Sequence, residues 1–420
     1  MVYLGNSETR DRVEGSIDVN ALVCHTSLLT TDEDLDQLEG EWDELLEDSP
    51  QWNFFLRWHW TRLWWKTYAP KHSHLFLVTC RTPSGRLVGL APLYWQRRRT
   101  GGLSKLREIV FLGTGIGIKI TEYSDIITRH EFGIVAATSI ARFIGNRRNW
   151  DRLWLWGIPA SSPTLHHFVK ALGNRATCNS TDRAQYVDTS TDWETFKQSV
   201  GKSSRENIIK HTRRIFKNYS CQFRRVDRLE EVWPAVDALV RLHQSRWQSK
   251  GEPGSFTTPY FENFLRSAIG ISHARGQLLL WSLTINERIV AVQVGFLDRG
   301  RAHAFQVGFD PEFAKLRLGN ILFWLCIQDC IESKDIIQFD FMGGGSAYKE
   351  LLAKNSLDLD EVELVRLGFP SIPYLVESKI LSILQSIWRG VVPGSIRAAR
   401  SEWLRRRRFR DSVLTRDGQG

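Results

Sequence analysis

The sequence has few cysteines and no long apolar run. Its six cysteines are widely scattered over 420 residues, and none belongs to a Cys-x-x-Cys pair. This favours reduced core cysteines over a disulfide framework or a zinc site. The longest apolar stretch, residues 321–331, is too short to cross a bilayer and predicts a buried helix. The polar N-terminal stretch MVYLGNSETRDRVEGS has no apolar segment typical of a secretory signal. We therefore expect a soluble, cytoplasmic protein.

The composition is that of a folded protein. Hydrophobic residues make up 42% of the chain and charged residues 25%, which excludes wholesale disorder. A chain of 420 residues is long enough for two ordinary domains. The net charge of +9 suits phosphates, nucleic acid or a lipid surface, and it does not choose among them.

Both halves of the chain show the same order of elements. Apolar runs separated by tight polar turns predict antiparallel strands. In the second half the predicted order is strands at 278–284, 288–297 and 302–309, a helix at 320–333, a strand at 336–341 and a helix at 346–353. In the first half it is strands at 75–80, 86–95 and 107–113, a helix at 131–144, a strand at 151–157 and a helix at 163–172. We predict an α+β fold of two similar domains in tandem, with mixed, mostly antiparallel sheets flanked by helices.

Two basic segments lie outside this repeat. A helix predicted at 203–219 carries lysines and arginines on one face, and a second helix at 232–249 follows it. The C-terminal stretch SIRAARSEWLRRRRFRDSV is arginine-dense and predicts a surface helix or a flexible arm. We therefore divide the chain into a first domain at 20–190, a second at 195–370 and a basic tail at 371–420.

Four stretches of the second half together resemble a known family: LHQSRW (242–247), LTINERIVAVQVGF (283–296), GFDPEFAKLRLGNIL (308–322) and FDFMGGGSAYKELLA (339–353). Their wording and order resemble the GNAT acyltransferases, and within them the CelD-type acetyltransferases named for bacterial cellulose biosynthesis, which are related to Fem-type transferases. The resemblance covers residues 195–355 well and the first half more loosely. It implies transfer of an acetyl or other acyl group from acyl-CoA to a sugar, polysaccharide precursor, lipid or amine. The second domain would be catalytic and the first would not.

The resemblance also implies where the donor binds. In the family, acyl-CoA lies between two splayed strands, and its pyrophosphate sits at the N-terminus of the next helix, where free N–H groups and the helix dipole favour an anion. The residues expected to bind the donor here are Lys315, Arg317, Gly319 and Asn320. The sequence departs from the family pattern, because Arg317 stands two rather than three residues before Gly319 and no second glycine follows. The alternative is an ordinary strand-to-helix loop with surface charges.

The stretch FDFMGGGSAYKE supplies the expected catalytic residues. By the resemblance, Tyr348 would protonate the departing CoA thiolate, and Lys349 would polarise the acyl carbonyl or bind a phosphate. Asp340 would be the general base, with a pKa raised by burial, and His303 on the preceding strand is a second candidate base. The alternatives are a capping or salt-bridging role for Asp340 and a solvated helix position for Lys349.

The acceptor is expected to contact a polar cluster of the first half, Glu122, Tyr123 and Asp125, and the glycine turn at Gly344. Consecutive glycines cost backbone entropy, so we expect something to approach the backbone closely at that turn. The alternative for the cluster is an ordinary loop between strands. No metal ion is expected.

Two other functions fit the same sequence. One is a Fem-type transfer from aminoacyl-tRNA, with the basic helix at 202–217 as a hint of an RNA-binding face. Nucleic acid is expected as a partner only in that case, as tRNA. The other is a non-catalytic binding protein that contacts anionic membrane peripherally through Trp403, Arg405–Arg408 and Phe409. Binding of acyl-CoA would separate these functions from acyl transfer.

Overall fold

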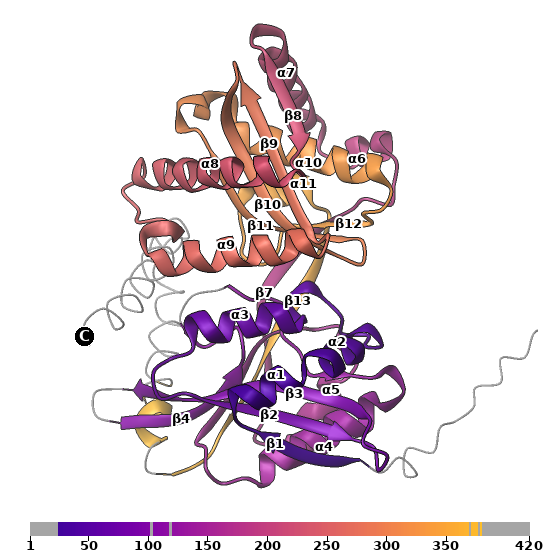
Figure 1. Cartoon of the computed structure of the whole chain (residues 1–420), viewed down its shortest axis with the longest axis vertical. Helices are drawn as coiled ribbons and strands as arrows, with labels where there is room; N and C mark the ends of the chain where they lie inside the picture. The colour runs from indigo at the N-terminus through magenta and orange to yellow at the C-terminus, as the bar shows by residue number, and fades with distance from the viewer. Residues whose placement is uncertain (1–23, 101–103, 117–119, 369–370, 377–378, 380–420) are drawn as a thin grey trace, which may run out of the picture.

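The structure is a computed structural model that describes residues 24–100, 104–116, 120–368, 371–376 and 379. The predicted tail residues Trp403, Arg405–Arg408 and Phe409 lie outside this part of the chain. The first half of the chain is the lower body in Figure 1, and the second half is the upper one.

The described elements of the first half are β1 (His25–Leu29), α1 (Asp32–Gln37), α2 (Glu39–Glu47), α3 (Trp58–Tyr68), β2 (His74–Arg81), β3 (Leu87–Thr100), β4 (Ser104–Phe111), β5 (Ile127–Thr128), α4 (Gly133–Asn146), β6 (Arg152–Pro159), α5 (Leu165–Leu172) and β7 (Thr177–Asp188). Those of the second half are α6 (Trp193–Ser199), α7 (Lys202–Asn218), β8 (Cys221–Arg225), α8 (Leu229–Gln248), α9 (Pro259–Ala274), β9 (Leu278–Ile285), β10 (Arg288–Asp298), β11 (Arg301–Phe309), α10 (Leu318–Ser333), β12 (Gln338–Asp340), α11 (Ala347–Leu352) and β13 (Asn355–Val365).

Both halves contain the predicted order of a three-stranded meander, a helix, a strand and a helix. In each half a strand and a set of helices precede this order and a further strand follows it, and the second half begins with two additional helices, α6 and α7. The predicted strands and helices lie within about two residues of the observed ones at most ends, the usual uncertainty of element boundaries. This confirms the predicted fold class, a mixed sheet flanked by helices in two similar halves.

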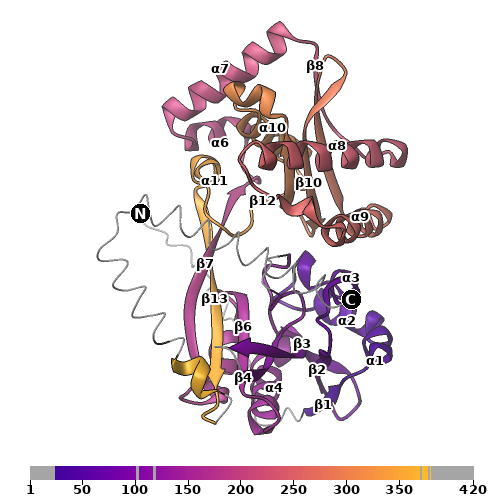
Figure 2. The ribbon, with the colours of Figure 1, turned by 90° about the vertical axis from the view of Figure 1, so that its left-hand side faces the viewer.

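The last strand of each half lies where the two halves join. The described strands form a 13-stranded sheet in the order β1-β2-β3-β4-β6-β13-β7-β12-β11-β10-β9-β8, with β5 beside β3. Strand β13 therefore leaves its own half and pairs with β6 of the first half, while β7 pairs with β12 of the second. Figure 2 shows β7 and β13 running side by side between the two bodies. The two halves thus share one continuous sheet.

An apolar core also crosses from one half to the other. The ring of Phe54 stacks on that of Phe296 with centroids 4.5 Å apart, and Trp60 meets Phe264 edge-on at 5.0 Å. Beside them the guanidinium of Arg57 donates to both carboxylate oxygens of Asp298, at 2.9 and 2.7 Å. The aromatic helix α3 of the first half is therefore core, packed against α9 of the second.

Replacing the buried Arg152 tests how much its ion pairs at β13 stabilise the fold. On β6, its guanidinium bonds Glu108 of β4 and Glu363 of β13, and Arg152 and Glu108 are 5% and 0% exposed. Replacing Arg152 by Met leaves a carboxylate buried without its closest cation. We expect the free energy of unfolding, measured by urea denaturation, to fall by about 3 kcal/mol.

The matched control is Arg183→Met. Arg183 pairs with Asp358 of the same strand β13 at 2.6 Å, but both side chains are largely exposed, so its loss should cost less than about 1 kcal/mol. Equal effects of the two substitutions would show that the buried network contributes no more than a surface pair.

Candidate active site

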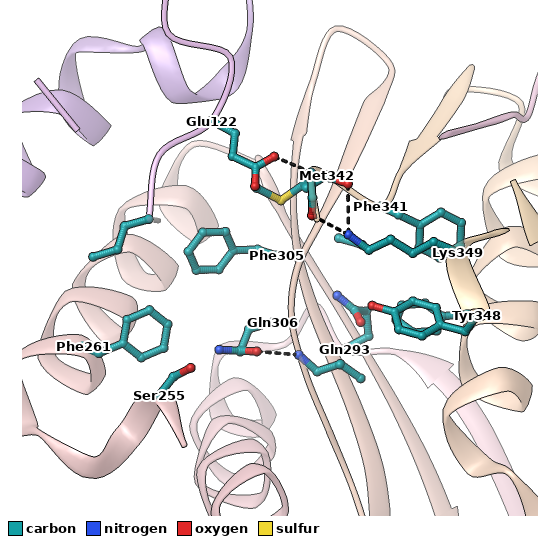
Figure 3. Close-up of a pocket in the computed structure, with 15 residues that line it drawn as sticks. Glu122, Ser255, Phe261, Gln293, Phe305, Gln306, Phe341, Met342, Tyr348 and Lys349 are labelled. Carbon is teal, nitrogen blue, oxygen red and sulfur yellow. Dashed lines mark hydrogen bonds between the residues drawn. The ribbon is translucent and has the colours of Figure 1, made fainter. Parts of the chain in front are cut away.

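Strands β11 and β12 pair over a short stretch and then part. Arg301–His303 lie parallel to Gln338–Asp340, whereas from Ala304 to Phe309 the pairing recorded for β11 is with β10, on its other side. Among the described residues, no strand therefore pairs with this edge of β11 beyond His303. Next to it lies a cavity of about 220 Å³, shown in Figure 3.

The cavity is lined by aromatic rings and by a small set of polar groups. The rings are Phe261, Phe305, Phe323, Phe341 and Tyr348, and the other polar side chains are Glu122, Ser255, Gln293, Gln306 and Lys349. Glu122 comes from the first half of the chain and the others from the second. A cavity that combines aromatic rings with fixed polar groups is typical of a small-molecule site.

The turn at residues 342–344 closes one side of this cavity. Met342 and Gly344 have left-handed backbones, with φ of +63° and +83°. Three carboxylates accept the N–H groups of the turn. Asp340 accepts the N–H of Met342 at 2.7 Å. Glu122 accepts the N–H of Gly343 at 2.5 Å, and Asp182 accepts the N–H of Gly344 at 3.2 Å.

Lys349 secures the same turn from the other side. Its ammonium donates to the carbonyls of Met342 and Gly343, at 3.0 and 2.6 Å, and the residue is 7% exposed. It is therefore not the solvated helix residue weighed from the sequence.

The close approach expected at the glycines comes from Glu122. A Cβ on Gly343 would lie 3.1 Å from a carboxylate oxygen of Glu122 and 3.2 Å from one of Asp182. Gly344 is explained by its positive φ, because L side chains disfavour that conformation. Nothing in the structure explains Gly345, where a Cβ would meet open space.

Asp340 lies behind the turn rather than among the residues that line the cavity. It is buried, and its carboxylate lies 3.2 Å from Nδ1 of His303. Burial acts to raise the pKa of Asp340, but the contacts with His303 and Tyr123 and the Met342 N–H outweigh it and hold that pKa below its usual value. The pKa expectation from the sequence was therefore wrong in direction, because it considered burial without these partners.

The other acceptor residues predicted from the first half are separated. Tyr123 packs beside His303 with ring centroids 5.7 Å apart, and burial together with the carboxylates of Asp340 and Glu122 raises its pKa. Asp125 is buried elsewhere, where it accepts the N–H of Ile126 at 2.7 Å. Neither Tyr123 nor Asp125 is among the residues that line the cavity.

Tyr348 faces the cavity from α11. Its ring stacks on that of Phe323 with centroids 4.8 Å apart. Burial raises the pKa of Tyr348, and nearby Arg246 opposes that shift. The Arg246 guanidinium itself lies 4.3 Å from the centroid of the Phe309 ring. The stretch LHQSRW contains Arg246, and sequence reasoning assigned it no role.

The predicted donor residues lie together at the start of α10. The helix begins at Leu318, two residues before the predicted start at 320, after Arg317 in a left-handed conformation, φ +54°. Lys315 and Arg317 are exposed. A Cβ on Gly319 would lie 2.9 Å from the Phe309 ring, so packing alone requires glycine there. Asn320 is in the first turn, and Phe323 of the same helix lines the cavity.

Two glutamines that line the cavity were not predicted as site residues from the sequence. Gln293 on β10 is 1% exposed, and its side-chain oxygen has no hydrogen-bond partner among the described residues. Gln306 on β11 accepts the N–H of Val307 at 3.2 Å. The sequence held a signal, since Gln-Val-Gly-Phe occurs in both strands, at 293–296 and 306–309.

Two features are absent from the described ranges of the chain. These ranges hold no group of three or more His, Cys, Asp or Glu side chains placed to bind a metal ion. They also hold no helix with the length and apolar character needed to span a bilayer.

The match to a family follows the part of the chain that builds the cavity. Residues 202–350 match the family model of the Acetyltransferase (GNAT) domain. The chain has a GNAT-domain acetyltransferase fold. The finer CelD-type assignment stays a prediction. A sequence comparison with curated proteins finds no match.

Two solved structures share the fold of this chain. The crystal structure of FemX has a TM-score of 0.54 at 10% identity, over 81% of this chain and 97% of that one. A conserved protein of unknown function from Bacteroides thetaiotaomicron has a TM-score of 0.51 at 10% identity, over 81% of this chain and all of that one. At this identity the likeness shows the fold alone, and it covers both halves.

Asp125, which lies away from the cavity, should make the stability of the protein depend on pH. Burial raises the pKa of Asp125 to about 7. Below about pH 4 the carboxyl is protonated in both the folded and the unfolded state, so it does not lower the free energy of unfolding. As the pH rises towards 7 it ionises in the unfolded state but stays protonated in the folded state, and the free energy of unfolding falls. We expect wild type to lose about 4 kcal/mol of unfolding free energy relative to Asp125→Asn over that range.

Urea denaturation at several pH values between 4 and 8 measures this difference. Asp227→Asn, at an exposed position, is the control and should follow the wild-type profile. Parallel profiles of wild type and Asp125→Asn across the whole range would contradict the prediction.

Proposed function

We propose that this protein is an acyltransferase that takes an acetyl or other acyl group from acyl-CoA at the parted strands β11 and β12. The observation that carries the proposal is the open edge of β11 from Ala304 to Phe309 beside the cavity. The GNAT match over residues 202–350 supports the same reaction class.

The donor's shape and charge suit the residues at this place. The amide-containing arm of CoA can hydrogen-bond to the open backbone edge of β11 as an added strand would. The unpartnered oxygen of Gln293 can accept an N–H from the arm or from the acceptor. The pyrophosphate would lie at the N-terminus of α10, near the exposed cations Lys315 and Arg317 and the N–H groups at Gly319 and Asn320.

The lining residues divide the proton transfers between them. The acceptor's nitrogen or oxygen attacks the thioester carbon, and its proton goes to the carboxylate of Glu122, which faces the cavity. The C–S bond breaks, and the Tyr348 hydroxyl gives a proton to the departing thiolate. Its pKa, raised by burial, keeps that hydroxyl protonated. Asp340 and Lys349 hold the 342–344 turn instead of touching the reacting atoms.

This assignment revises the roles of the two halves. The second half supplies the donor site and Tyr348, and the first half supplies Glu122. The acceptor is a sugar, a polysaccharide precursor, a lipid or an amine. The CelD-type resemblance supports the polysaccharide precursor and a bacterial, cytoplasmic setting, and the basic tail would add peripheral contact with anionic membrane.

A second candidate function is transfer from aminoacyl-tRNA. Helix α7 presents the cations Lys210, Arg213, Arg214 and Lys217, and none of them forms an ion pair among the described residues. Such a row of cations suits the phosphates of a nucleic acid. A basic, solvated helix would look the same, so acyl-CoA binding is the first measurement.

Donor binding is tested by isothermal titration of acetyl-CoA and CoA. The variant Lys315→Gln/Arg317→Asn removes both cations, and asparagine tolerates the left-handed backbone at 317. We expect wild type to bind both ligands, and the variant to bind about tenfold more weakly because two partly screened charges are lost. Gly319→Asp is a poorer test, because its Cβ would meet the Phe309 ring.

The control Lys66→Gln/Arg86→Gln removes the same charge from exposed positions of the first half and should bind as wild type does. Absence of acetyl-CoA and CoA binding in wild type would contradict the donor assignment and favour aminoacyl-tRNA. If both double variants bound acetyl-CoA and CoA equally weakly, the effect would come from the overall charge of the protein rather than from the start of α10.

Glu122 is tested by turnover. In Glu122→Gln the amide oxygen of the new side chain can still accept the Gly343 N–H, so this variant should fold and bind donor normally. Turnover is followed by the loss of thioester absorbance with a panel of amine and sugar acceptors. The kcat of the variant should be about a hundredfold or more below that of wild type, because the base is lost. Full turnover by this variant would exclude Glu122 as the base, and exposed Glu131→Gln is the control.

A further inference from the structure

A second cavity lies in the first half of the chain. It encloses about 510 Å³ where strands β1 to β4 meet the loop between α4 and β6. It shares no lining residue with the cavity of Figure 3. Its volume lies in the range of sites that hold small organic molecules.

The floor of this second cavity is apolar and carries an aromatic plane. Leu28, Phe76 and Trp95 line it, and Trp95 is half-buried. The ring of His74 lies 5.7 Å from that of Trp95, and the guanidinium of Arg97 lies 5.6 Å from the Trp95 centroid. A flat apolar group could therefore pack here beside nitrogen donors.

The rim of the cavity is basic. His72, His74, Arg97 and Arg107 line it, and no carboxylate is among its lining residues in the described part of the chain. Arg97 and Arg107 stand directly opposite each other in the β3–β4 ladder. Like charges at directly opposed positions of a ladder repel and destabilise the pairing.

One of the two arginines is paired with a carboxylate, which reduces this repulsion. Asp151 accepts two hydrogen bonds from the Arg107 guanidinium, at 3.0 and 2.7 Å. Arg97 has no such partner among the described residues, where its recorded contact is with the Trp95 ring. The cavity thus keeps an unpaired guanidinium next to two imidazoles and above an apolar floor.

We propose that this second cavity binds an organic anion, a planar or apolar group that carries a phosphate or a carboxylate. The apolar part packs on Trp95, Phe76 and Leu28, and the anionic group pairs with Arg97 and His74. The site is separate from the acyl-transfer cavity, and it does not depend on the proposed function.

Equilibrium dialysis of the full chain tests this site with three matched probes. They are 1-naphthyl phosphate, 1-naphthoate and neutral 1-naphthol, each followed by absorbance. We expect single-site binding of one or both anions, and binding at least about tenfold weaker for naphthol, as loss of a charge-assisted pair predicts. The tighter of the two anions identifies the acidic group that the site prefers.

The variant Arg97→Gln removes the unpaired cation from an exposed position, and Arg86→Gln removes one from the opposite end of the same β2–β3 hairpin. We expect Arg97→Gln to weaken anion binding about fivefold or more and Arg86→Gln to leave it unchanged. His74→Gln should weaken it as well. The proposal is overturned if neither anion binds wild type, if naphthol binds as tightly as the anions, or if both arginine variants bind as wild type does.

Discussion

The candidate site depends on where strand β12 stops pairing with β11. A parallel pair of three residues, closed at His303 and Asp340, is enough to hold the two strands together at one end and lets them diverge at the other. Beyond that point β11 has an open edge, and the chain that leaves β12 turns away through residues 342–344. The cavity, its aromatic lining and the position of Tyr348 all follow from this divergence.

The divergence is held open by both halves of the molecule. Glu122 and Asp182 from the first half accept N–H groups of the turn, and Lys349 of the second half binds its carbonyls. The exchange of β7 and β13 brings Asp182 within reach of the turn, because β7 pairs with β12. The site is therefore built from two halves that share one sheet, which explains why the second half alone could not be read as a complete active site from its sequence.

Local sequence patterns were enough to predict most of the elements. Alternating and continuous apolar runs placed β9, β10, β11 and α10, since each buries its own residues against neighbours close in the chain. Strand β13 carries such an alternation in LDLDEVELV, which the sequence analysis did not use, whereas β7 shows none. The residues of β7 are mostly exposed along its length, and their pairing is with partners far away in sequence. A mostly polar and exposed strand such as β7 leaves no periodic apolar pattern in its sequence.

The candidate site could likewise be predicted only where local sequence patterns determine it. The stretch from Phe339 to Glu350 was singled out because glycines next to a strand end are a local signal, and Tyr348 does face the cavity. The direction of the pKa shift of Asp340 could not be predicted correctly, because this pKa depends on His303 and Tyr123, which only the fold brings beside it. Gly319 was predicted from the resemblance as a donor-binding position, and the close packing of the Phe309 ring against it could not be predicted from the sequence.

The most direct test of the open edge is hydrogen–deuterium exchange of the backbone amides with and without saturating acetyl-CoA. A donor that adds to the edge of β11 should slow exchange in residues 304–309 and in the first turn of α10, while the amides of β1 and β2 keep their rates. Unchanged exchange at 304–309 while acetyl-CoA is bound would place the donor elsewhere and contradict the account.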